Sequence, residues 1–132
     1  MRRGGIIHPE LARVLAGLGH RDVLVIADAG LPVPPGVARI DLAYRLGAPR
    51  FADVVQAVAD ELVAEQVVVA VEAEEVSPEV VAAVRAAFPD CALEQMSHPE
   101  LKRQSAQASA VVRTGEATPY ANVLIRCGVP FG

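Results

Sequence analysis

The sequence predicts one three-layer α/β domain, with helices on both faces of a mainly parallel or mixed sheet of about six strands. Continuous apolar runs at 23–27 and 67–71 are typical of strands that are buried on both faces. Segments with helical spacing of apolar residues alternate with strand-like runs over most of the chain. Because no polar or low-complexity linker interrupts the 132 residues, we expect a single domain over residues 1–132.

The first half of the chain is expected to form helices and strands in alternation. A helix begins at His8-Pro9-Glu10, where an early proline loses no hydrogen bond, and ends at Gly19. The apolar strand over 23–27 follows. The next strand alternates apolar and polar side chains from 39 to 44, and a helix carries one apolar stripe from 51 to 62. The second buried run then supplies a third strand.

The second half continues this alternation. Ser77-Pro78-Glu79 predicts the start of a helix with Ser77 as its N-cap, and apolar residues line the buried side of this helix as far as Phe88. A short strand over 91–95 leads to Ser97-His98-Pro99-Glu100, which fits a capping box at the start of a fourth helix. The last third contributes two strands, at 110–113 and 122–126.

Charge and cysteine content exclude two classes of function. The net charge is −4 and the 12 basic residues are scattered, so the chain has no basic patch for nucleic acid. Cys91 and Cys127 lack the spacing of a zinc site and are expected to be reduced core residues. We therefore expect neither a nucleic-acid partner nor a bound metal.

The apolar content predicts association with other copies of the chain. Hydrophobic residues make up 52% of this small domain, so part of its apolar surface is expected to be covered in a homo-oligomer. The apolar runs are much shorter than the ~18 residues of a membrane span, and the start of the chain lacks the apolar stretch of a signal peptide. We expect a cytoplasmic protein without a membrane partner.

A histidine and an aspartate flank the strand at 23–27. His20 lies just past the first predicted helix, where the partial negative charge of the helix end favours a protonated imidazole. It is either a general acid or base, or only an electrostatic partner of the helix. Asp28 lies at the carboxyl end of the strand, where open α/β sheets hold ligands, but it can also serve as a turn residue before Ala29-Gly30.

Further polar residues stand at predicted element ends. His98 is either a ligand-binding residue or an ordinary first-turn residue of its helix. If the last strand has begun by Tyr120, then Tyr120 and Asn122 share one face and present a phenol and an amide together. Otherwise they form a polar loop that closes onto the strand. Charged residues at other strand ends are expected to form solvated pairs outside the site: Arg39, Asp41, Arg113 and Glu116.

The order of these residues resembles the ribose pyranase (ribose mutarotase) family. The family signature runs Gly-His, Asp, a hydrophobic strand and Asp-Ala-Gly-Leu-Pro, and this chain has Gly19-His20, Asp22 and Asp28-Ala29-Gly30-Leu31-Pro32. Further matching stretches follow in the same order: Arg39-Ile40-Asp41-Leu42, Ser97-His98, Arg113-Thr114-Gly115-Glu116 and Pro119-Tyr120-Ala121-Asn122. The resemblance therefore covers essentially the whole chain.

The resemblance implies an isomerase that interconverts the β-pyranose and β-furanose forms of D-ribose by acid–base ring opening and closing, without a cofactor. It implies that His20 is the proton donor and that four residues bind the sugar: Asp28, His98, Tyr120 and Asn122. It also implies a ring-shaped homo-oligomer, a decamer, with sites at subunit clefts where Tyr120 and Asn122 complete the pocket of a neighbouring subunit.

Two alternatives stay open. The related L-fucose mutarotases typically carry Asp-Ala-Asn-Phe-Pro where this chain has Asp28-Ala29-Gly30-Leu31-Pro32, so the loop favours ribose. A non-catalytic sugar-binding accessory protein of a transport or phosphorylation system would use the same pocket without turnover.

Overall fold

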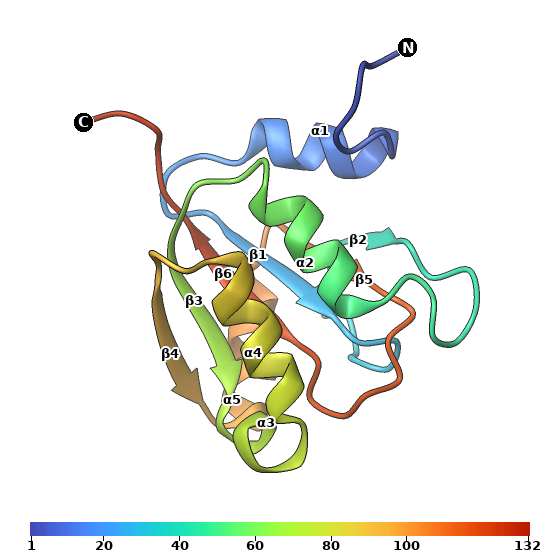
Figure 1. Cartoon of the computed structure of the whole chain (residues 1–132), viewed down its shortest axis with the longest axis vertical. Coiled ribbons are helices and arrows are strands. Elements are labelled where there is room, and N and C mark those ends of the chain that lie inside the picture. Colours follow the sequence, from blue (N-terminus) through green and yellow to red (C-terminus); the bar gives the residue numbers. More distant parts are fainter.

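The computed structural model describes residues 1–132 and is built on a six-stranded sheet (Figure 1). The strands are β1 Val23–Ala27, β2 Ala38–Asp41, β3 Ala64–Ala70, β4 Ala92–Met96, β5 Ala110–Arg113 and β6 Val123–Cys127. Their order in the sheet is β2-β5-β1-β6-β3-β4. β6 is antiparallel to β1 and β3, whereas the other pairings are parallel. The amino end of β6 therefore lies at the same edge as the carboxyl ends of the other strands.

Helices cover both faces of this sheet. They are α1 Pro9–Gly17, α2 Phe51–Ala59, α3 Val71–Val76, α4 Pro78–Ala87 and α5 His98–Gln104, and the 3₁₀ helix η1 Ser105–Gln107 follows α5. Figure 1 shows α1, α2 and α4 on one face and α5 on the other. The predicted three-layer α/β architecture with a mixed sheet is therefore confirmed. None of the helices has the length and apolar character needed to cross a membrane.

The apolar runs are continuous because both faces of the sheet are buried. In β1, Leu24 and Ile26 belong to the larger core, together with residues of α1, α2 and α4. Val25 and Ala27 belong to a smaller core on the other face. All four side chains have 0% exposure. A strand with only one buried face would alternate apolar and polar residues instead.

Strand β2 is shorter than the alternating pattern predicts. The pattern continues to Tyr44, but the strand ends at Asp41, whose partner Arg113 is the last residue of β5. Beyond this pair the neighbouring strand has ended, and the Tyr44 N–H instead donates to the Ala48 carbonyl oxygen at 3.4 Å in a turn. The alternation of apolar and polar side chains along β2 carries no information about where its partner strand β5 ends.

The helix α3 is absent from the sequence-based prediction. It begins at Val71, the last residue of the predicted third strand, and Pro78 separates it from α4 because proline cannot donate the next helical hydrogen bond. The helix α4 begins where predicted and Ser77 occupies its N-cap position, but the Ser77 side chain makes no capping hydrogen bond. Ser77 is buried and its hydroxyl donates to the Pro119 carbonyl oxygen.

Two other predicted helix ends differ in detail. The helix α1 ends at Gly17 rather than at Gly19. The capping box of α5 is half formed, because the Ser97 hydroxyl accepts from the Glu100 N–H at 3.3 Å, while the Glu100 carboxylate binds Arg103 and Gln104 further along the helix. These charged and polar neighbours compete for the carboxylate that would complete the box.

Candidate active site

Most of the predicted site residues meet at one edge of the sheet. Asp28 follows β1, His98 follows β4, and Tyr120 and Asn122 precede β6. This is the edge at which the parallel strands end, where open α/β sheets bind ligands. Asn122 reaches this edge because β6 runs antiparallel to its neighbours.

Asp28 and Asn122 hold each other in a fixed orientation. The Asp28 N–H donates to Asn122 Oδ1 at 2.9 Å, and Asn122 Nδ2 donates to Asp28 Oδ2 at 3.1 Å. The other carboxylate oxygen, Oδ1, accepts from the Gly30 N–H at 2.9 Å. Asn122 is fully buried, so these bonds satisfy a side chain that water does not reach. The Asp28 carboxylate is thus held in place before any ligand arrives.

Tyr120 lies in a tight turn before β6. Its φ is 62°, an uncommon value for a residue with a side chain, and its carbonyl oxygen accepts from the Asn122 N–H at 2.8 Å. Because β6 begins only at Val123, Tyr120 and Asn122 do not lie on one strand face. The Tyr120 ring instead meets the His98 ring edge to face, with centroids 5.1 Å apart and an interplanar angle of 79°.

His98 is anchored through its backbone. Its N–H donates to Glu72 Oε1 at 3.0 Å and to Glu72 Oε2 at 3.1 Å, which ties the start of α5 to α3. The ring atom Nδ1 is buried and has no hydrogen-bond partner in the chain. A buried polar atom normally has a partner, so this nitrogen is available to a hydroxyl group of a ligand.

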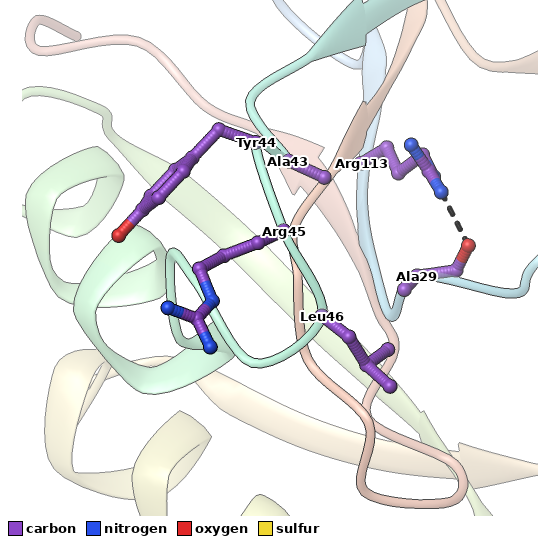
Figure 2. Close-up of a pocket in the computed structure, with 6 residues that line it drawn as sticks. All are labelled: Ala29, Ala43, Tyr44, Arg45, Leu46 and Arg113. Atoms are coloured by element: carbon purple, nitrogen blue, oxygen red, sulfur yellow. Dashed lines mark hydrogen bonds between the residues drawn. The ribbon is translucent and has the colours of Figure 1, made fainter.

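A cavity of about 530 Å³ opens beside Asp28. This volume lies within the range of small-molecule sites. A second cavity of about 270 Å³ adjoins it and shares Ala29, Leu46 and Arg113 with it (Figure 2). In Figure 2 the Arg113 guanidinium points to the Ala29 carbonyl, whereas the Tyr44 and Arg45 side chains extend in the opposite direction. Arg113, Glu116 and Thr118 are the polar residues that line the larger cavity with Asp28.

The two loops that enclose these cavities are bound to each other through their backbones. The Gly47 N–H donates to the Gly115 carbonyl oxygen at 2.6 Å, and the Gly115 N–H donates to the Pro49 carbonyl oxygen at 2.9 Å. A Cβ atom at Gly115 would lie 2.2 Å from the Ala48 oxygen. Only glycine fits this approach, so the loops form a defined wall.

Glu116 joins the same wall to the helix α2. Its Oε1 accepts from the Phe51 N–H at 3.0 Å at the start of α2, and its Oε2 accepts from the Thr118 hydroxyl at 2.9 Å. Burial alone would raise the pKa of Glu116, but the hydrogen bonds from Phe51 and Thr118 outweigh it, so that this pKa lies below its ordinary value. The ionised carboxylate also complements the positive end of the helix.

The lowered pKa of Glu116 predicts a pH dependence of stability. The folded protein binds the proton on Glu116 less tightly than the unfolded chain does, so the stabilisation is complete well above pH 4.5, the ordinary value. It is lost as the pH falls from there through the lower pKa of the folded protein. We expect Glu116→Gln to be less stable than the unmodified protein at pH 7, and the difference to shrink below about pH 4. Thermal unfolding of both proteins across this pH range measures the difference in stability. The control is Glu79→Gln, an exposed first-turn carboxylate of α4, and an equal effect there would contradict the assignment.

His20 lies at the opposite edge of the sheet. The steps from Asp22 to Asp28, at about 3.3 Å each, place roughly 20 Å of strand between the two ends of β1. The His20 ring atom Nε2 contacts Glu65 Oε1, and the side chains are 50% and 42% exposed. The structure therefore does not bring His20 and Asp28 of one chain together, although they are near in sequence.

Glu65 contacts His20, and no sequence pattern points to this contact. It lies near the start of β3, which begins at Ala64 rather than at 67, because Ala64 and Gln66 pair with the end of β6. A Cβ atom at Gly128 would lie 3.0 Å from Glu65 Cγ, so the small residue leaves room for this carboxylate. Only its contact with His20 makes Glu65 a candidate site residue, since no motif surrounds it in the sequence.

The cysteines have no reactive character. Burial, with a smaller contribution from Asp22, raises the pKa of Cys127 to about 11, and burial with Glu65 raises the pKa of Cys91. Both thiols therefore stay protonated at neutral pH and are poor nucleophiles. No group of three or more His, Cys, Asp or Glu side chains is placed to hold a metal ion.

Comparison with known proteins gives relatives over the full chain. Residues 1–130 match the model of the RbsD / FucU transport protein family. The D-ribose pyranase of Bacillus licheniformis is 50% identical over 131 residues, which are 99% of this chain and 100% of that protein. D-ribose pyranase 1 of Rubrobacter xylanophilus is 51% identical over the same shares.

Solved structures agree with this relationship. Bacillus subtilis RbsD complexed with D-ribose superposes with a TM-score of 0.95 at 44% identity, covering 99% of this chain and 100% of that one. The fucose mutarotase of Streptococcus pneumoniae in complex with L-fucose has a TM-score of 0.79 at 21% identity, with 95% of each chain covered, and shares the fold. With matches of this extent in both sequence and structure, the chain belongs to the RbsD / FucU transport protein family.

Proposed function

We propose that this protein is an isomerase that interconverts the β-pyranose and β-furanose forms of D-ribose. The observation that carries the proposal is the full-length similarity, at about half identical residues, to proteins named D-ribose pyranase. The cavity beside Asp28 supports it, because its polar lining of Asp28, Arg113, Glu116 and Thr118 suits a ligand rich in hydroxyl groups. Asn122 holds the Asp28 carboxylate from behind, and the Tyr120 and His98 rings pack together at the same edge of the sheet.

The chemistry needs only proton transfer. To open the hemiacetal, the ring oxygen must gain a proton and the anomeric hydroxyl must lose one, and the open aldehyde then recloses through another hydroxyl. His20 is the proposed donor, since an imidazole exchanges protons near neutral pH. Glu65 contacts Nε2 of the ring, so Nδ1 is the proposed nitrogen for proton transfer with the sugar. Asp28, His98, Tyr120 and Asn122 are the proposed sugar-binding residues, which align the ring with this donor.

Because His20 and Asp28 of one chain lie at opposite edges of the sheet, we propose a site that is shared between two copies of the chain. We expect His20 of one copy to enter the Asp28 cleft of a neighbouring copy, so that each complete site uses two chains. The family resemblance implies that Tyr120 and Asn122 complete the pocket of a neighbour. Asn122 bonds to Asp28 of its own chain, which supports the proposal that the neighbour contributes His20 instead.

Exposed apolar side chains at both edges support such contacts. Tyr44 and Leu46 are 79% and 73% exposed beside the cavities at the Asp28 edge. Val63 and Phe131 are 43% and 78% exposed, and the backbone bond from the Gly128 N–H to the Val63 oxygen places Val63 at the His20 edge. Unlike edges that bind each other form a head-to-tail interface, which closes into a ring when the rotation allows. Two expectations stay predictions: the ring-shaped decamer, which the family resemblance implies, and the cytoplasmic location, which the sequence pattern favours.

A non-catalytic sugar-binding role is the second candidate, because the matching family is described as a transport protein family. Such a protein would bind ribose in the same cleft without accelerating ring opening. An L-fucose mutarotase is less well supported, since the solved fucose mutarotase is only 21% identical and the loop at Asp28 carries Gly30-Leu31.

Magnetisation-exchange NMR on D-ribose distinguishes these functions. We expect catalytic amounts of the protein to speed exchange between the pyranose and furanose signals, and L-fucose anomers to exchange at the rate of the buffer. Heat-denatured protein is the control. Ribose that binds without faster exchange would establish the accessory role, and fucose exchange alone would establish the mutarotase.

A further inference from the structure

The turn that carries Asp28 is held from several directions. The Ala29 N–H donates to the Glu116 carbonyl oxygen at 2.9 Å, and the Ala29 carbonyl accepts from Arg113 Nε at 3.0 Å (Figure 2). The Gly30 N–H donates to Asp28 itself. Ala29 is therefore bonded through its N–H by Glu116 and through its carbonyl group by Arg113, so that two successive peptide groups after Asp28 are held by the end of β5 and the residues that follow it.

Arg113 is itself oriented by Asp41. In the sheet Arg113 pairs with Ala27 of β1 on one side and with Asp41 of β2 on the other. Its Nη1 donates to both carboxylate oxygens of Asp41, at 3.2 and 3.0 Å, while its Nε bonds Ala29. One planar guanidinium thus connects the ends of β2, β5 and β1.

This pair differs from an ordinary surface ion pair. Arg39 also lies near Asp41, but at 3.9 Å and with a side chain that is 51% exposed. Arg113 is 31% exposed and divides its donors between a carboxylate and a backbone carbonyl. A lysine has a single ammonium group and cannot reproduce this planar fork of donors. The geometry is that of a support for the turn and not of a solvated charge pair.

We infer that Arg113, oriented by Asp41, is a positioning residue that sets the Asp28 carboxylate for sugar binding; this inference rests on the proposed ribose site. Arg113 fixes the Ala29 carbonyl and so limits rotation of the Ala29–Gly30 peptide, whose N–H donates to Asp28 Oδ1. Asn122 fixes the carboxylate through its other oxygen, Oδ2. When the Arg113 contact is lost, the turn samples other orientations and the sugar hydroxyls lose a preorganised acceptor.

The test compares Arg113→Lys and Asp41→Asn with the control Arg39→Lys, which changes an arginine beside the same carboxylate without touching the turn. We expect Arg113→Lys to raise KM for ribose about tenfold and to leave kcat within about twofold, since binding rather than proton transfer is affected. Asp41→Asn should act in the same direction but less, and the double variant should be no worse than Arg113→Lys because both act through one contact. Arg39→Lys should match the unmodified protein.

Amide hydrogen exchange at Ala29 and Gly30 gives a readout that needs no sugar. Faster amide exchange in Arg113→Lys and Asp41→Asn, but not in Arg39→Lys, supports the inference. This holds even if the unmodified protein proves inactive on ribose, because that inactivity would overturn only the proposed function. Unchanged exchange and unchanged KM in folded variants overturn the inference, as does an equal effect of Arg39→Lys. If Arg113→Lys does not fold, the same measurements on Asp41→Asn decide whether the inference holds.

Discussion

Replacement of His20 by alanine is expected to lower the rate of ribose ring exchange by about 10²–10⁴-fold, the usual contribution of one well-placed acid or base. Ribose binding should persist within about threefold, because in the proposed site the cleft around Asp28 holds the sugar and His20 acts on the transition state. Exchange NMR gives the rate, and calorimetric titration with ribose gives the dissociation constant. Asp28→Ala should show the reverse pattern, with binding lost first.

The control for the loss of an imidazole is His8→Ser. His8 Nδ1 accepts from the Leu11 N–H at the start of α1, and serine can supply the same cap. This variant should keep the full exchange rate. A folded His20→Ala protein that retains full activity would remove His20 from the mechanism, and the proton donor would then have to lie at the Asp28 edge.

Mixing two inactive variants is expected to restore activity if the site is shared between copies. Random assembly of equal amounts of His20→Ala and Tyr120→Ala gives about a quarter of the sites an intact His20 from one copy and an intact cleft from the other. The exchange rate of the mixture should therefore rise to about a quarter of that of the unmodified protein. Subunits are exchanged by mild denaturation and refolding, and native mass spectrometry reports the mixed oligomers.

The matched control is a mixture of Asp28→Ala and Tyr120→Ala. Both defects lie at the same edge, so no site in the mixture has an intact cleft and the mixture should stay inactive. Absence of recovery in confirmed mixed oligomers of the first pair would show that each site is built within one chain. Light scattering that finds only monomers would remove the proposed assembly altogether.

The amino-acid sequence alone is sufficient to predict the layers of the fold and the edge at which the site lies. Val23 to Ala27 is apolar without interruption because both faces of β1 are buried, so the strand and its position inside an α/β sheet follow from composition. Asp28 follows that strand directly in the sequence, so it must lie at the carboxyl end of the strand. Helix α4 begins at Pro78 as predicted, since proline has a strong local preference for a first turn.

Only the tertiary structure decides which of the polar residues meet. Asn122 pairs with Asp28 across 94 positions because β6 runs antiparallel, and strand direction is set by the packing of the whole sheet. Glu65 meets His20 across 45 positions through the pairing of β3 with the end of β6. Arg113 supports the Asp28 turn because β5 lies between β1 and β2. His20 and Asp28, only eight positions apart, lie at opposite edges because an extended strand advances about 3.3 Å with every residue between them.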